Sequence, residues 1–189
     1  MINFTEVIEN DKPTIHGLAD SVGIGMSEAK TVVGKVLPVF ATGLIKTLDN
    51  EQELTYLYRD LSTHNYEQYL ENPEQVLLEQ GAISDGNEIL SHVFKAKEIS
   101  KGVATKVAEE TGVSEGIIKK LLPIIATVVM GAVTRQAKEA HLLDGDIGGN
   151  NIASLGGMLT TFLNSGKEDV IFNEVVAKVG GSYFKDTKH

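Results

Sequence analysis

The chain has 189 residues, of which 42% are hydrophobic and 23% charged, and this composition argues against wholesale disorder and against a fibrous repeat. It contains no cysteine, which excludes disulfide scaffolds, thiolate nucleophiles and cysteine-ligated zinc. The net charge of -9 arises between Asp49 and His92, where ten acidic residues stand against Arg59 alone. We therefore expect two nearly neutral parts joined by an acidic middle.

Residues 1 to 48 predict a first helical unit. Its start, MINFTEVIENDKP, lacks the basic residues and the apolar core of a signal peptide, so the expected location is the cytoplasm. A short helical stretch ends near the glycines of GLADSVGIG, and Ser27 follows as the predicted N-cap of a longer helix. Pro38 lies well inside that helix, where a proline is expected to bend it.

Residues 49 to 84 predict an acidic helical connector. Asn50 with Glu53 has the spacing of a capping box, and Leu54, Leu57 and Leu61 recur at helical spacing. Two interpretations stay open. The connector is either an amphipathic helix with a solvated acidic face, which we favour, or a partner surface built on tyrosines, a residue type enriched at protein contacts. The four tyrosines concerned are Tyr56, Tyr58, Tyr66 and Tyr69.

Residues 85 to 189 predict a second helical unit followed by C-terminal helices. Gly112 predicts the end of one helix, Ser114 the N-cap of the next, and Pro123 a second bend. The uncharged run from Leu121 to Val133 is much shorter than the roughly 20 residues that span a bilayer. We therefore expect this run to be buried in the protein and expect no membrane span.

The two units are related in sequence. SEAKTVVGKVLPVFATGLIKTL (residues 27 to 48) and SEGIIKKLLPIIATVVMGAV (residues 114 to 133) both begin Ser-Glu, reach Leu-Pro and continue through two apolar residues to Ala-Thr. No hairpin dipeptide flanked by alternating apolar residues occurs. The predicted fold is all-α and multihelical, with two related helix-turn-helix-like units whose second helices are kinked by proline.

The run DGNEILSHVFKAKE (residues 85 to 98) and the unit that follows it resemble a bacterial family, the YidB-like proteins of domain of unknown function 937. The family signature Asp-Gly-Asn-x-Ile-Leu-x-His-x-Phe is matched here, with Asn87 and His92 at its polar positions. The resemblance implies a multihelical fold with a homeodomain-like motif, and no established activity. By spacing, Asp85 and Glu88 predict a capping box. His92 is expected to hydrogen-bond a helix end to a neighbouring turn, with a pair to Glu88 as the alternative.

The stretch from residue 100 to 122 also has the pattern of a DNA-binding helix-turn-helix. Under that hypothesis Lys106, Lys119 and Lys120 would contact nucleic acid. The second helix, however, offers Glu115 and Ile117 where base edges require arginine, asparagine or glutamine. We therefore favour a protein that acts through contacts with an unknown protein partner or through self-association, with nucleic-acid binding as the alternative.

Catalytic and metal-binding patterns are missing from the sequence. The five histidines include no i, i+4 pair of the kind that a helical metal site uses. DGDIGGNN, from Asp144, agrees with a calcium loop only at the first and third positions, because Gly148 and Leu155 occupy the fifth and twelfth. No Gly-x-Ser-x-Gly elbow and no Walker lysine occurs. We expect no enzyme, no cofactor and no metal site.

Overall fold

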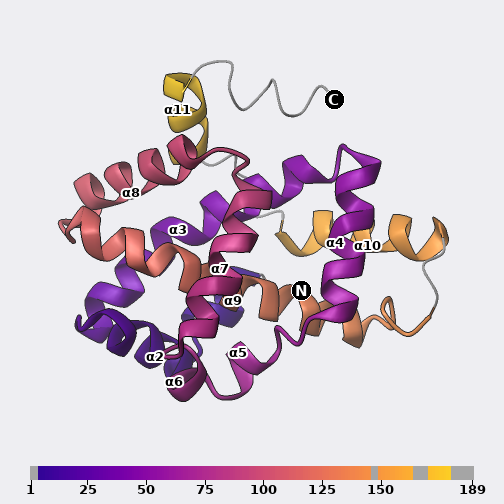
Figure 1. The fold of residues 1–189 in the computed structure, drawn as a ribbon, viewed down its shortest axis with the longest axis horizontal. Helices are drawn as coiled ribbons and strands as arrows, with labels where there is room; N and C mark the ends of the chain where they lie inside the picture. Colours follow the sequence, from indigo (N-terminus) through magenta and orange to yellow (C-terminus); the bar gives the residue numbers. More distant parts are fainter. Residues whose placement is uncertain (1–3, 146–148, 164–169, 180–189) are drawn as a thin grey trace.

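The computed structural model describes residues 4–145, 149–163 and 170–179, and these ranges are helical without any strand, which confirms the all-α prediction. In Figure 1, α9 runs through the middle of the molecule and α7 crosses it. The helices of the described ranges are α1 (Phe4–Glu9), α2 (Lys12–Val22), α3 (Met26–Thr47), α4 (Glu51–Thr63), α5 (Gln68–Glu71), α6 (Pro73–Val76), α7 (Gln80–Val93), α8 (Lys97–Thr111), α9 (Glu115–Glu139), α10 (Gly149–Leu163) and α11 (Val170–Val179).

Two pairs of consecutive helices are joined through a glycine. α2 ends at Gly23 and α8 ends at Gly112, and both glycines have a positive φ, 71° and 76°, that a residue with a side chain rarely adopts. Ser114 then caps α9, and its hydroxyl accepts a hydrogen bond from the Ile117 amide at 3.3 Å, as predicted. The predicted cap at Ser27 is wrong.

The helix α3 begins two residues earlier than its sequence suggested. Gly25 occupies the N-cap position, so Ser27 lies inside the first turn, where its side chain cannot reach an unpaired amide ahead of it. Glu28 takes over part of the capping, because its carboxylate accepts from the Gly25 amide at 3.4 Å. Pro38 and Pro123 both lie inside continuous helices, and a bend at either proline stays a prediction.

The core is organised around α9. Every residue from Leu121 to Val133 is buried, as predicted. Among the described residues, α9 is the single helix that is long and apolar enough to cross a membrane. The helices α3 and α4 would add a second candidate only if they formed one span together, and they are bent by 120° relative to each other. Most of the apolar window of α9, 78%, is buried inside the molecule, which is typical of a core helix.

Close contact between α7 and α9 depends on Gly86. A Cβ atom at this position would lie 1.9 Å from the backbone oxygen of Pro123, so only glycine permits the two backbones to approach this closely. The predicted cap at Asp85 is wrong, because α7 begins five residues earlier, at Gln80. Asp85 instead accepts a hydrogen bond of 2.5 Å from the Tyr69 hydroxyl.

Buried side chains from all three predicted segments belong to one hydrophobic cluster. Phe40 packs against Phe94 with ring centroids 5.2 Å apart, and Phe4 packs edge-on against Phe162 at 5.9 Å. These contacts join the first unit directly to the second. The division into units at residues 48 and 84, packed as one domain or as two adjoining domains, remains a prediction, and the packing runs across both boundaries.

Candidate functional site

Helix α7, which carries the family-like signature, presents opposite faces to two hollows. Residues three and four positions apart share a helix face, so Asn87, Leu90 and Ser91 point to one side. Ile89 and His92 point to the other side. We call the first hollow the lysine groove and the second the tyrosine–histidine pocket.

The lysine groove lies between the C-terminal half of α7, the start of α8 and the first turns of α9, and has a volume of about 690 Å3. Leu90 and Leu122 provide an apolar floor, since both side chains are buried. Four lysines and three small polar side chains surround this floor. The residues that line the groove are Asn87, Leu90, Ser91, Lys95, Ala96, Lys97, Ser100, Lys101, Lys119 and Leu122.

The lining of the lysine groove is positively charged. Its lining residues include no carboxylate. Two of its lysines form ion pairs with carboxylates outside the lining: Lys95 Nζ lies 2.7 Å from Glu53, and Lys119 Nζ lies 2.8 Å from Glu115. Lys97 and Lys101 are exposed and form no ion pair within the described residues. The groove therefore gathers positive charge on a protein whose net charge is -9.

The turn between α7 and α8 positions two of these lysines. Lys95 has a φ of 65°, a left-handed conformation that is uncommon for a residue with a side chain, and it reverses the chain between the helices. Ala96 follows as the N-cap of α8 and has no side chain able to accept from the first amides. The positive end of the α8 dipole and Lys97 thus lie together at the rim of the groove.

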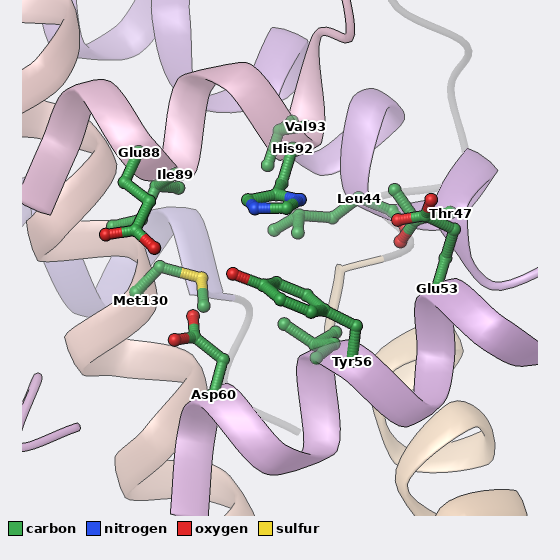
Figure 2. A pocket seen from close by; sticks show the side chains of 11 residues that line it. Leu44, Thr47, Glu53, Tyr56, Asp60, Glu88, Ile89, His92, Val93 and Met130 are labelled. Atoms are coloured by element: carbon green, nitrogen blue, oxygen red, sulfur yellow. The ribbon is translucent and has the colours of Figure 1, made fainter. Parts of the chain in front are cut away.

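The tyrosine–histidine pocket lies between α4 and α7 and has a volume of about 30 Å3, room for little more than a water molecule. In Figure 2 the His92 ring lies over the Tyr56 ring, with the carboxylates of Glu88 and Asp60 on one side and that of Glu53 on the other. The residues that line the pocket are Leu44, Thr47, Glu53, Tyr56, Leu57, Asp60, Glu88, Ile89, His92, Val93 and Met130.

Two aromatic rings stack at this pocket. The rings of Tyr56 and His92 have centroids 4.1 Å apart and planes inclined by 26°. The imidazole of His92 also acts electrostatically on the Asp60 carboxylate. The predicted hydrogen bond of His92 to a turn, with a pair to Glu88 as the alternative, stays a prediction. Burial raises the pKa of Tyr56, as do the nearby carboxylates of Asp60, Glu88 and Glu53.

Asp60 is the most enclosed carboxylate of the pocket, with a side chain only 10% exposed. It accepts a hydrogen bond of 2.8 Å from the Tyr66 hydroxyl, and His64 Nδ1 lies 2.9 Å from its other oxygen. Burial raises the pKa of Asp60 above its ordinary value, although the Tyr66 hydrogen bond and the charge of His64 act in the opposite direction. These contacts tie the end of α4 to the segment that follows it.

The predicted tyrosine surface does not form. Tyr58, Tyr66 and Tyr69 are buried, with exposed fractions of 1%, 3% and 2%, because their rings pack into the hydrophobic cluster. Their hydroxyls find polar partners at its edge, two of which are Asp60 and Asp85. Of the four tyrosines of the predicted surface, Tyr56 alone stays exposed, at 37%.

Of the three lysines predicted to contact nucleic acid, one lines the lysine groove. Lys119 lines the lysine groove, whereas Lys106 turns toward α11, where its Nζ lies 3.2 Å from Glu174. Lys120 is exposed outside the groove lining. Sequence reasoning missed Lys95, Lys97 and Lys101, although the excess of lysine over glutamate between residues 95 and 120 was a signal for them.

No metal centre is apparent in the part of the chain that the structure describes. Within these residues, no group of three or more histidine, aspartate or glutamate side chains could hold a metal ion. The calcium-loop comparison from Asp144 falls partly on residues 146–148, which lie outside the described ranges. The three carboxylates of the tyrosine–histidine pocket are therefore not arranged as a metal cage.

In a comparison with known proteins, one family model matches the chain. The family model described as "Bacterial protein of unknown function (DUF937)" matches residues 8–136. No curated protein and no solved structure matches the chain. Every residue that lines the lysine groove or the tyrosine–histidine pocket falls within the matched range.

Proposed function

The chain belongs to the bacterial DUF937 family of unknown function, and we propose that it is a non-enzymatic binding protein whose lysine groove takes an acidic segment of a partner protein. One observation carries this proposal. Four lysines line a groove of about 690 Å3 whose lining contains no carboxylate, on a protein with a net charge of -9. Charge segregated in this way favours a negatively charged ligand.

The floor of the groove decides what kind of acidic ligand fits. An exposed ion pair contributes about 0 to 1 kcal/mol, whereas a micromolar complex requires about 8 kcal/mol. The four lysines alone fall short of that value. Burying one large aliphatic side chain adds about 1.5 to 3 kcal/mol, and Leu90 and Leu122 offer a surface for it. The ligand that matches is a polypeptide segment with carboxylates around apolar side chains.

In this proposal the helix pair α8–α9 has a structural role and supports the groove. Both α2–α3 and α8–α9 consist of a helix that ends on a glycine with positive φ and a longer helix with an internal proline. This shared construction supports a repeat of one homeodomain-like unit. In the second copy the body of α9 is buried, so its first turns, with Lys119, supply one wall of the groove. The cytoplasmic location stays a prediction.

Nucleic-acid binding through the same groove is the second candidate function. Lys97 and Lys101 favour it, because both ammonium groups are exposed and form no ion pair within the described residues. Against it, the groove lining offers no arginine or aromatic side chain to a base, and the negative net charge repels a polyanion at long range. Such binding would be weak and would fall steeply with salt.

Fluorescence anisotropy with three labelled probes separates these functions. The probes are a short peptide of alternating glutamate and leucine, the same peptide with lysine in place of glutamate, and a mixed-sequence DNA duplex. We expect the acidic peptide to bind best, and Lys97→Glu with Lys101→Glu to weaken it about tenfold or more. The matched control reverses two exposed lysines far from the groove, Lys12→Glu with Lys30→Glu.

Equal effects of the two double variants would contradict a role for the groove. Tighter binding of the DNA than of the acidic peptide, lost on the groove variant and at high salt, would establish the second candidate instead. Light scattering on the pure protein completes the test. A mass that falls to one chain in the groove variant would identify a second copy of the protein as the acidic partner.

A further inference from the structure

Tyr56 separates two hollows on the surface of α4. On its inner side is the tyrosine–histidine pocket, of about 30 Å3. On its outer side is an open hollow of about 370 Å3, which Tyr56 lines together with Glu51, Gln52, Thr55 and Arg59. The ring is 37% exposed, and its aromatic contact is the stack on His92. Because exposed side chains change rotamer readily, an outward turn of Tyr56 joins the two hollows into one site.

The inside of the joined site is apolar, and its rim is negative. Leu57, Ile89 and Met130 give the pocket an apolar lining, and the carboxylates of Glu53, Asp60 and Glu88 also line it. In Figure 2 Asp60 and Glu88 lie on one side of the two rings and Glu53 lies on the other. Glu53 is paired with Lys95, but Glu88 is exposed and has no ion pair within the described residues. A positively charged group is therefore complementary to this rim.

The shape of the site selects the kind of cation. Within the described residues the carboxylates do not form a group that could coordinate a metal ion, so the site does not suit a metal cation. The apolar lining requires a ligand with a hydrocarbon stem, and the carboxylates of Asp60 and Glu88 suit an ammonium group at its end. In Figure 2 the Tyr56 hydroxyl points toward the side where Asp60 and Glu88 lie.

We propose that this pocket is a second binding site, distinct from the lysine groove, that opens by rotation of Tyr56 and takes an alkylammonium group. The hydrocarbon stem lies on Leu57, Ile89 and Met130. The ammonium lies between Asp60 and Glu88, against the face of His92. The same chemistry is offered by a free primary amine and by a lysine side chain of another polypeptide.

Nuclear magnetic resonance titration of the full chain tests the proposal, with the imidazole of His92 as the reporter. The probes are n-hexylammonium chloride, neutral 1-hexanol and Nα-acetyl-lysine-N-methylamide. We expect n-hexylammonium to shift the His92 signals with an affinity about tenfold above that of 1-hexanol. If the lysine derivative saturates the site at concentrations similar to those of n-hexylammonium, the natural ligand is a lysine side chain. If n-hexylammonium binds and the lysine derivative does not, the natural ligand is a free amine.

Three variants make the test specific. Glu88→Gln removes the unpaired carboxylate and should weaken n-hexylammonium binding about tenfold, whereas Glu79→Gln, an exposed position outside the pocket lining, should not change it. Tyr56→Ala removes the closed state and should strengthen binding severalfold. Equal binding of amine and alcohol, equal effects of the two glutamine variants, or weaker binding by Tyr56→Ala would each overturn the proposal.

Discussion

At the scale of single residues, the contact between Gly86 and Pro123 sets how closely α7 and α9 approach. An added Cβ at Gly86 would lie 1.9 Å from the Pro123 oxygen, which is backbone and cannot rotate away. We expect Gly86→Ala to lower the free energy of unfolding by about 3 kcal/mol or more, because both helices must shift. Urea denaturation followed by circular dichroism measures the change.

The control for this variant lies in the same helix. A Cβ at Gly81 meets nothing within 4 Å, so Gly81→Ala should change the free energy of unfolding by about 1 kcal/mol or less. If the two alanine variants proved equally stable, the close approach of α7 and α9 would not be a constraint on the fold.

The raised pKa of Asp60 makes a second prediction at this scale. Between its ordinary value of 3.8 and its raised value in the fold, the folded chain binds more protons than the unfolded chain. The stability contribution of Asp60 therefore falls as pH rises through that window.

Urea denaturation of the wild type and of Asp60→Asn across acidic to neutral pH measures this contribution. The asparagine keeps an acceptor for the Tyr66 hydroxyl, so the two proteins differ chiefly in the ionisable group. We expect the wild type to lose stability relative to Asp60→Asn as pH rises. A relative gain with rising pH would mean that the fold favours the carboxylate. Asp20→Asn, at an exposed ion pair with His16, serves as the control.

Individual residues also show where sequence reasoning stops. Ser114 and Asn50 were predictable caps, because a cap depends on amides two or three residues away. Asp85 was not predictable, because its partner Tyr69 lies 16 residues earlier and meets it only in the folded chain. The burial of Tyr58, Tyr66 and Tyr69 has the same cause, since the hydrophobic cluster that takes their rings forms from distant helices.

At the scale of helices, α3 and α9, whose sequences share the Ser-Glu and Leu-Pro pattern, begin in different ways. Ser114 accepts from the Ile117 amide, whereas Ser27 lies exposed inside the first turn of α3. We therefore expect Ser114→Ala to lower the melting temperature, with a loss of about 1 kcal/mol, and Ser27→Ala to leave it nearly unchanged. Calorimetry on the two variants compares them directly. Equal losses would mean that the α3 cap is Ser27 after all.

The burial of helix α9 was predictable because it depends on one continuous run of apolar residues, from Leu121 to Val133. The lysine groove was not, because it is assembled from three helices whose relative placement depends on the approach at Gly86 and on the left-handed turn at Lys95. The excess of lysine in the sequence indicated positive charge but carried no information about a concave surface. Helical elements are thus easier to predict than the hollows between them.

At the scale of the whole molecule, the lysine groove and the tyrosine–histidine pocket lie on opposite faces of α7 and share one ion pair. Lys95 lines the groove, and its Nζ lies 2.7 Å from Glu53, which lines the pocket. The Lys95 side chain is 12% exposed, so this pair is shielded from solvent more than the other lysine pairs of the described residues. An acidic ligand in the groove competes with Glu53 for Lys95.

This competition predicts positive coupling between the two proposed ligands. When an acidic peptide draws Lys95 into the groove, Glu53 loses its cationic partner at the pocket rim, and n-hexylammonium should bind more tightly, by about 1 kcal/mol. Calorimetric titration of the amine with and without saturating peptide measures the effect, which must be reciprocal. Lys95→Met should strengthen amine binding without peptide and abolish the coupling. Coupling that persists in Lys95→Met would show that another contact links the two sites.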